Sequence, residues 1–270
     1  MSPIQVVING AAGKMGRMIA AGVHSQDDMQ VAAGVEAPGS PHLGQDAGEL
    51  AGVGFLEAPV VESLETVIDK ADVLIEFTRP GPTLQHLRAA ARTQTPFVIA
   101  TTGFEEEELA EISELAQQTP TVMAPNFSVG VNTLIKAVAL VAETLGDAYD
   151  IEIVEAHHNE KVDAPSGTAV RLADVAAEAV GRSMRSVGVY GRHGIVGARK
   201  PKEIGVHAVR GGDIVGDHTV MFAGKGERIE LVHRSQSREA FASGAIRAAR
   251  WIVSAPKGLH SFDDVLFGQD

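Results

Sequence analysis

The sequence lacks cysteine and is short of basic residues. Without cysteine the chain can form no disulfide, no thiolate metal site and no cysteine nucleophile, which is the usage expected in a reducing cytoplasm. Its 23 lysines and arginines face 35 aspartates and glutamates, a net charge of −12. This balance argues against nucleic acid bound through a general basic surface. An anionic ligand would therefore need cations gathered at one place.

Long hydrophobic runs are also missing. No stretch approaches ~18 consecutive apolar residues, the length needed to span a membrane. The N-terminus enters an apolar strand without a cationic leader, so we expect a cytoplasmic protein that is not inserted in a membrane. A length of 270 residues favours one or two domains. Glycine, in contrast, is plentiful, and the positions of the 29 glycines are informative.

Strands and helices alternate in the first half of the sequence. Short β-branched runs predict strands at 4–9, 31–35, 73–77, 97–100 and 121–124. Helical patterns lie between them at 14–25, 83–92 and 105–117, and a Gly- and Pro-rich segment at 37–54 reads as a long surface loop. Such alternation predicts an α/β fold with a Rossmann-like, doubly wound parallel sheet.

The pattern changes near residue 126. An apolar helix (131–145), a strand (149–156) and another helix (168–180) are followed by extended runs at 187–190, 204–210, 219–223 and 229–232. Successive strands without helices between them predict a second, α+β domain with a mixed or antiparallel sheet. An amphipathic helix at 240–253 closes the chain and is expected to return to the first domain.

A glycine-rich turn joins the first strand to the first helix. Gly10, Gly13 and Gly16 have the spacing G-x-x-G-x-x-G, in which the backbone can turn tightly and approach a pyrophosphate at the helix N-terminus. Glu36 ends the second strand, where an acid can bind the adenosine ribose hydroxyls. Alternatively, the turn binds nothing and Glu36 is a solvated surface charge. The sequence is not a P-loop, because no Ser or Thr follows Lys14.

Three further loops follow predicted parallel strands, at 77–80, 100–104 and 124–127. Ligands of such folds bind outside the carboxyl ends of the strands. Each loop could be a simple turn, but together they predict a pocket for the nicotinamide and its ribose.

The segment from His157 to Thr168 carries the chemistry. It places two imidazoles, the Lys161 ammonium and the backbone N–H groups of Ser166, Gly167 and Thr168 within a dozen residues. In an acidic chain this is a concentrated site for carboxylates, and histidine or a tuned lysine can donate a proton. Two alternatives are a metal site on the adjacent histidines, and surface histidines beside a helix cap. We predict no metal.

The segment 157–169 resembles the defining motif of the dihydrodipicolinate reductase family, and the turn 10–16 resembles that family's cofactor motif. The runs at 77–80, 100–104 and 126–132 are similar to further family landmarks in order and spacing. The resemblance covers essentially the whole chain. It implies a dinucleotide-binding domain of residues 1–128 and 240–270, and a domain of residues 129–239 that binds substrate and builds a tetramer.

Residue roles follow from the resemblance. His157 is similar to the family's proton donor or acceptor and Lys161 to its second proton donor. Substrate carboxylates are expected to bind His158, Ser166, Gly167 and Thr168, with Arg238 a weaker candidate. The residues predicted to bind cofactor are Gly10, Ala11, Ala12, Gly13, Lys14, Met15, Glu36, Phe77, Arg79, Ala100, Thr101, Thr102, Ala124, Pro125, Asn126 and Phe127. Where some members carry an arginine after the ribose-binding acid, this chain has Ala37.

The resemblance implies an NAD(P)H-dependent oxidoreductase that uses NADH and NADPH. It would reduce 4-hydroxy-tetrahydrodipicolinate, a dicarboxylate, to tetrahydrodipicolinate with loss of water, in diaminopimelate and lysine biosynthesis. A phosphorylating semialdehyde dehydrogenase shares the glycine turn, but it requires the thiol that is absent here. A family member acting on, or desulfurating, another substrate and a non-catalytic NAD-binding module are the alternatives.

Overall fold

The computed structural model describes residues 2–268, which fold as two compact units. Unit 1 comprises residues 1–128 with 239–270, and unit 2 comprises residues 129–238. The return to unit 1 therefore begins one residue before the predicted position.

Unit 1 is built on a seven-stranded parallel sheet in the order β12-β6-β5-β4-β1-β2-β3. Its strands are β1 (Ile4–Asn9), β2 (Met29–Val35), β3 (Val60–Val61), β4 (Val73–Glu76), β5 (Phe97–Ile99), β6 (Pro120–Met123) and β12 (Gly258–His260). Its helices are α1 (Lys14–His24), α2 (Ala47–Ala51), α3 (Pro80–Thr93), α4 (Glu106–Leu115), α8 (Glu239–Ile252) and α9 (Phe262–Phe267). The predicted doubly wound parallel sheet is thus confirmed.

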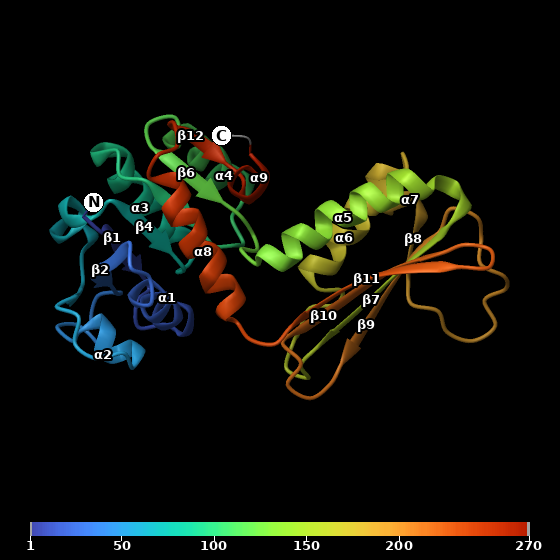
Figure 1. Cartoon of the computed structure of the whole chain (residues 1–270), viewed down its shortest axis with the longest axis horizontal. Helices are drawn as coiled ribbons and strands as arrows, with labels where there is room; N and C mark the ends of the chain where they lie inside the picture. Colours follow the sequence, from blue (N-terminus) through green and yellow to red (C-terminus); the bar gives the residue numbers. More distant parts are fainter. Residues whose placement is uncertain (1, 269–270) are drawn as a thin grey trace. The chain divides into compact units, whose positions relative to one another are not determined.

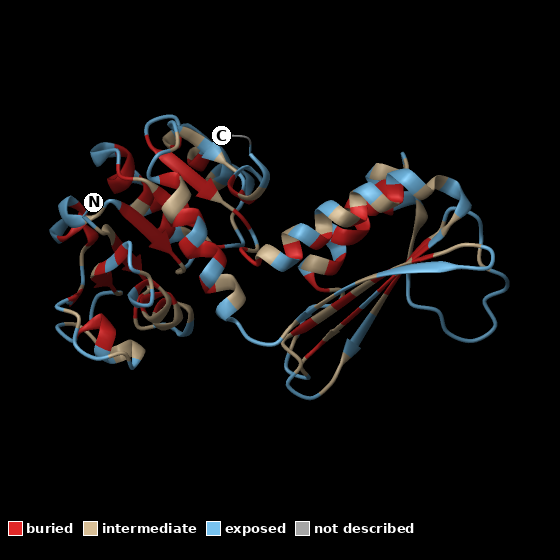
Figure 2. Cartoon of the chain, viewed as in Figure 1, coloured by how far each residue is buried: buried red, intermediate tan, exposed pale blue. Residues whose placement is uncertain are grey.

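Helices cover both faces of this sheet. Helix α1 packs beside α8, which lies against β4, β5 and β6, and α3 packs beside α4 (Figure 1). The central strands β4 and β5 are buried along their whole length, as Figure 2 shows, whereas the edge strand β12 is not. The helix predicted at 240–253 corresponds to α8, which groups with unit 1 through these contacts.

The segment predicted as a plain loop at 37–54 contains a helix. Asp46, only 5% exposed, caps α2 by accepting hydrogen bonds from the N–H groups of Gly48 and Glu49. The same carboxylate also accepts from Leu56 and Ala58 farther along the chain. The prediction failed because five helical residues are too few to show a hydrophobic period. Also missed were β3, β12, α9 and, in unit 2, α7 (Met184–Val187), which are all short.

Unit 2 pairs a five-stranded mixed sheet, ordered β11-β10-β7-β9-β8, with helices on one of its faces. The strands are β7 (Asp150–His157), β8 (Gly188–Tyr190), β9 (Ile204–Arg210), β10 (Gly216–Ala223) and β11 (Arg228–Ser235). The helices are α5 (Val129–Leu145), α6 (Gly167–Ala179) and α7 (Met184–Val187). β7 pairs with β10 antiparallel and with β9 parallel, which confirms a mixed sheet.

One segment in the described part of the chain, Val129–Ala148, is long and apolar enough to cross a membrane by length and composition. This helix is not a run of consecutive apolar residues, because Asn132, Lys136 and Glu143 interrupt it. Leu134, Val138 and Ala142 of this helix lie in the unit 2 core with side chains of α6 and the sheet, as in a core helix of a globular domain.

Candidate active site

The glycine turn holds the N-terminus of α1 close to the ends of β1 and β2. Gly10 has φ +80°, and its N–H donates to the carbonyl of Val35 over 2.8 Å. A Cβ on Gly16 would lie 2.2 Å from the Gly10 carbonyl oxygen, so only glycine lets the helix start this near the strand. Gly13 and Lys14 remain exposed at the helix N-terminus, where backbone N–H groups and the helix dipole favour an anion.

Glu36 faces this turn from the end of β2. Its Oε1 accepts a 2.8 Å hydrogen bond from the N–H of Ala12. Both groups line a hollow of about 880 Å³ in unit 1. Among the predicted cofactor residues, the hollow is also lined by Gly10, Gly13, Phe77 and Arg79. The structure therefore brings together the turn, Glu36 and the loop after β4.

The loops after β5 and β6 lie at the same edge of the sheet, but several of their side chains are engaged in packing. Thr101 is buried and accepts a 2.8 Å hydrogen bond from the Thr83 hydroxyl. Phe127 is also buried, with its ring 4.9 Å from that of Phe262. In contrast, Thr102 and Pro125 are exposed, while Ala100 and Asn126 are half-buried. Contacts of Thr101 and Phe127 with a ligand would therefore come from their backbone.

Sequence reasoning missed a buried acid beneath this edge. Glu76 ends β4, is fully buried, and accepts hydrogen bonds from Asn9 Nδ2 (2.9 Å) and the His86 imidazole (2.7 Å). It also binds the N–H and hydroxyl of Thr78. His86 lines the hollow. The sequence did contain a signal for this buried acid, because Glu76 is the last residue of the otherwise apolar strand Val73–Glu76.

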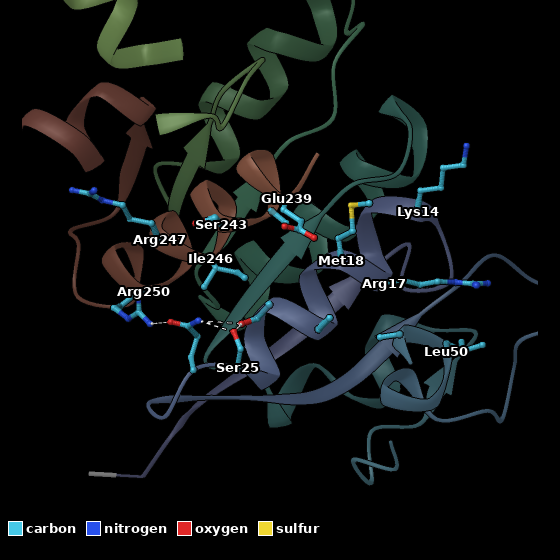
Figure 3. A pocket seen from close by; sticks show the side chains of 15 residues that line it. Lys14, Arg17, Met18, Ser25, Leu50, Glu239, Ser243, Ile246, Arg247 and Arg250 are labelled. Atoms are coloured by element: carbon cyan, nitrogen blue, oxygen red, sulfur yellow. Dashed lines mark hydrogen bonds between the residues drawn. The ribbon is translucent and has the colours of Figure 1, made fainter. Parts of the chain in front are cut away.

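A second hollow in unit 1, of about 790 Å³, lies between α1 and α8 (Figure 3). Lys14 and Arg17 stand on one side of it, and Arg247 and Arg250 on the other. Arg250 is bound by Asp28 at 2.6 and 2.8 Å. Of the predicted cofactor residues this hollow includes only Lys14, so it is not the predicted nucleotide site.

In unit 2, the predicted segment runs from the end of β7 to the start of α6. β7 ends at His157, which is 9% exposed, and His158 begins the loop with its N–H donating to Ile214. Lys161 Nζ lies 2.7 Å from Asp163 Oδ1, and this ammonium lowers the pKa of the Asp163 carboxyl. The two imidazoles and the ammonium therefore lie at the end of β7 and on the short loop that follows it.

His157 is held from the interior of unit 2. Its Nδ1 lies 2.6 Å from Oε2 of Glu155, a fully buried carboxylate that also binds Arg210. The His218 ring is 5.2 Å away, edge-on to the His157 ring. Burial first, and the charge of His157 second, lower the pKa of His218 to about 4. His218 is therefore neutral beside a histidine that can carry a proton.

The start of α6 is only partly open. Ser166 caps the helix by accepting from the Ala169 N–H, its Oγ lies 3.1 Å from His218 Nε2, and its own N–H donates to Glu155. Ser166 is buried with both groups engaged, so the structure gives it a supporting position and not the exposed one predicted. Gly167 is exposed and Thr168 half-buried. Arg238 is exposed in the connection between β11 and α8.

Fold and site together define an α/β protein with a dinucleotide-type glycine turn and a separate domain in which two imidazoles and an ammonium precede a helix N-terminus. Residues 4–127 match the family described as dihydrodipicolinate reductase, N-terminus, and residues 130–266 the one described as dihydrodipicolinate reductase, C-terminus. The chain belongs to the dihydrodipicolinate reductase family.

Individual relatives are similar over nearly the full length. A 4-hydroxy-tetrahydrodipicolinate reductase of Magnetococcus marinus is 51% identical over 97% of this chain and 98% of its own. That of Syntrophotalea carbinolica is 48% identical over the same shares. A solved structure of a dipicolinate-bound dihydrodipicolinate reductase from Paenisporosarcina sp. TG-14 is 28% identical, with a TM-score of 0.76 over 96% of this chain and 97% of that one.

Proposed function

We propose that this chain is an NAD(P)H-dependent oxidoreductase that converts 4-hydroxy-tetrahydrodipicolinate to tetrahydrodipicolinate. One hydride and one proton are added and one water is lost, a step of diaminopimelate and lysine biosynthesis that we place in the cytoplasm. The observation that carries the proposal is the loop 157–168, where a buried imidazole, an ammonium and a helix N-terminus meet in an acidic chain. Relatives of about half-identical sequence bear this reductase's name, which supports it.

The cofactor site is assigned to the turn and the strand ends of unit 1. Gly16 admits no side chain, Gly13 is exposed at the start of α1, and Glu36 faces the hollow, so the residues present fit a dinucleotide. The exposed amides would hold the pyrophosphate and Glu36 the adenosine ribose. When bound, the nicotinamide supplies the hydride. The loops after β4, β5 and β6 would enclose the remainder of the cofactor.

The substrate site is assigned to unit 2. A dicarboxylate would be held by His158, by the Lys161 ammonium, and by Gly167 and Thr168 at the N-terminus of α6. This helix has 13 residues. Lys161 and His157 would each hold a proton near the reacting atoms. Arg238 stays a weaker candidate for a carboxylate. The dipicolinate bound to the Paenisporosarcina protein is itself a dicarboxylate, which supports this assignment.

We further propose a homotetramer assembled through unit 2. Helices α5 and α6 pack on one face of its sheet, whereas Val154, Val209 and Val232 on the opposite face are 37 to 48% exposed. The register places His207, Val154, Thr219 and Val232 in one row across the strands, and Val209 lies two residues along β9 from His207 on the same face. Such a face, beside the sheet edges, is suited to symmetric association with other copies.

The activity is tested by following the oxidation of NADH and NADPH with freshly generated 4-hydroxy-tetrahydrodipicolinate. We expect turnover with both cofactors and inhibition by dipicolinate. Binding of NADH without any turnover would instead indicate a non-catalytic nucleotide-binding module. Turnover only with another imine or sulfur-containing substrate would indicate a diverged member of the family.

A further inference from the structure

An ion pair between the fully buried Glu155 and the partly exposed Arg210 lies beside His157 and is not explained by the roles assigned above. Glu155 Oε2 lies 2.6 Å from His157 Nδ1 and accepts from Arg210 Nη1 over 2.8 Å. Glu155 Oε1 accepts from Arg210 Nη2 over 2.9 Å and from the Ser166 N–H over 3.0 Å. Both oxygens are therefore satisfied, as a carboxylate in the interior requires.

Arg210 reaches this carboxylate from the neighbouring strand. In the parallel pair of β7 and β9 it stands opposite His157. Besides the two bonds to Glu155, Arg210 Nη2 donates to the carbonyl of Asp163 over 2.6 Å. Asp163 is the partner of Lys161, and Ser166 caps α6. One ion pair thus joins the imidazole, the turn that carries the ammonium and the start of the carboxylate-binding helix.

The contact also determines which nitrogen of His157 can exchange a proton. Burial alone would raise the pKa of Glu155, but hydrogen bonds from Arg210, His157 and the Ser166 amide outweigh it and lower that pKa. An ionised carboxylate only accepts hydrogen bonds, so Nδ1 must carry a proton. Exchange is then confined to Nε2. A Cβ at Gly216 would lie 3.0 Å from Nε2, so the glycine keeps this side of the ring uncrowded.

We propose that Glu155 and Arg210 are positioning residues for the reaction proposed above, with Glu155 fixing the protonated Nδ1 of His157 and Arg210 tying Glu155 to the substrate-binding loop. Neither residue touches the reacting atoms. Their charges act on His157 in opposite senses, because the carboxylate favours an imidazolium and the guanidinium disfavours it. His218 on β10 faces this ring, and the charges of His233 and Lys161 act in turn on His218.

Because the two charges act on His157 in opposite senses, removing each one should shift the pH profile in a different direction. A simple loss of packing would not produce such opposite shifts. In Glu155→Gln, kcat should fall by at least about tenfold, towards the roughly 10⁴-fold known when a histidine loses its orienting carboxylate. The alkaline limb of the kcat/KM profile should move to lower pH, because the imidazolium has lost its counterion. In Arg210→Met the same limb should move to higher pH. Limbs that stay in place, or move in the same direction, would overturn the proposal.

Arg210→Lys separates the effect of the charge from the effect of the geometry. It also provides a test of the role of Arg210 if Arg210→Met does not fold. It keeps the cation but not the two-point contact, so the limb should stay close to wild type while KM for the dicarboxylate rises severalfold. An unchanged KM would count against the role in the loop. Asp147→Asn is the matched control. Asp147 also forms an ion pair, with Arg182, but it precedes the start of β7, whereas His157 is at the end of that strand. Both the kinetic constants and the pH profile of this variant should match wild type.

A readout independent of turnover keeps this inference distinct from the proposed activity. Nitrogen NMR of histidine-labelled protein without ligands should show His157 protonated at Nδ1 in wild type and Asp147→Asn, and exchanging between tautomers in Glu155→Gln. If the wild type shows this tautomer but reduces no substrate, the proposed function fails and the positioning role stands. If wild-type His157 is protonated at Nε2 alone, the positioning role fails whatever the activity.

Discussion

At the scale of single residues, two side chains on one loop are expected to perform the proton chemistry. His157→Ala and Lys161→Ala should fold normally, since His157 is the last residue of β7, Lys161 lies on the loop after it, and neither belongs to the hydrophobic core of unit 2. We expect kcat to fall by ~10²–10⁴-fold in each, the typical contribution of a positioned proton donor. KM should also rise in Lys161→Ala, because a carboxylate partner is lost. Steady-state kinetics with thermal melts check this, and near-wild-type kinetics in both would remove the loop from the active site.

A second residue-scale prediction concerns cofactor choice. Glu36 would share its carboxylate between the Ala12 N–H and the ribose, and a 2′-phosphate would be repelled by it. The next residue, Ala37, offers no cation, so NADH should serve at least as well as NADPH. Ala37→Arg should shift kcat/KM towards NADPH, because a guanidinium can bind the phosphate at two points. A wild-type preference for NADPH of about tenfold or more, or no shift in the variant, would contradict this.

Buried His218 makes stability depend on pH. Its pKa falls from 6.5 in the unfolded chain to about 4 in the fold, chiefly through burial. Between those values the unfolded chain binds a proton that the folded chain does not, so stability is fully present above about pH 6.5 and falls as pH drops towards 4. The loss amounts to about 3 kcal/mol at most.

Urea unfolding across this pH range should therefore show a steeper loss in wild type than in His218→Gln. Glu152 does not contribute in this pH range. Its pKa is about 2 in the folded protein, so it changes the stability only below pH 4.5, its pKa in the unfolded chain. Parallel curves for the two proteins would show that another group is responsible.

At the scale of elements, the start of α1 depends on a close approach of helix and strand. Gly16→Ala should lower the free energy of unfolding by about 1–3 kcal/mol, because its Cβ would meet the Gly10 carbonyl oxygen and Ala11 within 2.8 Å. It should also weaken NADH binding by displacing the amides of the turn. Denaturation and fluorescence titration measure both effects.

Gly81→Ala is the matched control for this prediction. Gly81 also lies in the first turn of a helix, α3, but a Cβ there meets nothing within 4 Å. Alanine should be neutral or slightly stabilising at that position. Equal effects of the two substitutions would show that contact at the turn is not the cause.

At the scale of the whole molecule, the open face of the unit 2 sheet should hold the tetramer together. Val154→Asp places a charge in the centre of this face and should shift the mass measured by light scattering towards smaller species. Val253→Asp in unit 1 is the control, because Val253 is 38% exposed and Val154 37%. A wild type that is monomeric at micromolar concentration, or a tetrameric Val154→Asp, would contradict the prediction.

The sequence by itself determined the parallel sheet, the mixed sheet and the loop 157–168, because each leaves a local signature in period, turn chemistry or motif. It did not reveal α2, where the Asp46 carboxylate accepts from two N–H groups of the helix, Gly48 and Glu49, and from two farther along the chain, Leu56 and Ala58. Nor did it show that Ser166 and Phe127 are buried. Only the tertiary structure decided that Glu155 and Arg210, 55 residues apart, form one ion pair behind His157. Such partners are set by strand pairing, and spacing along the chain carries no record of strand pairing.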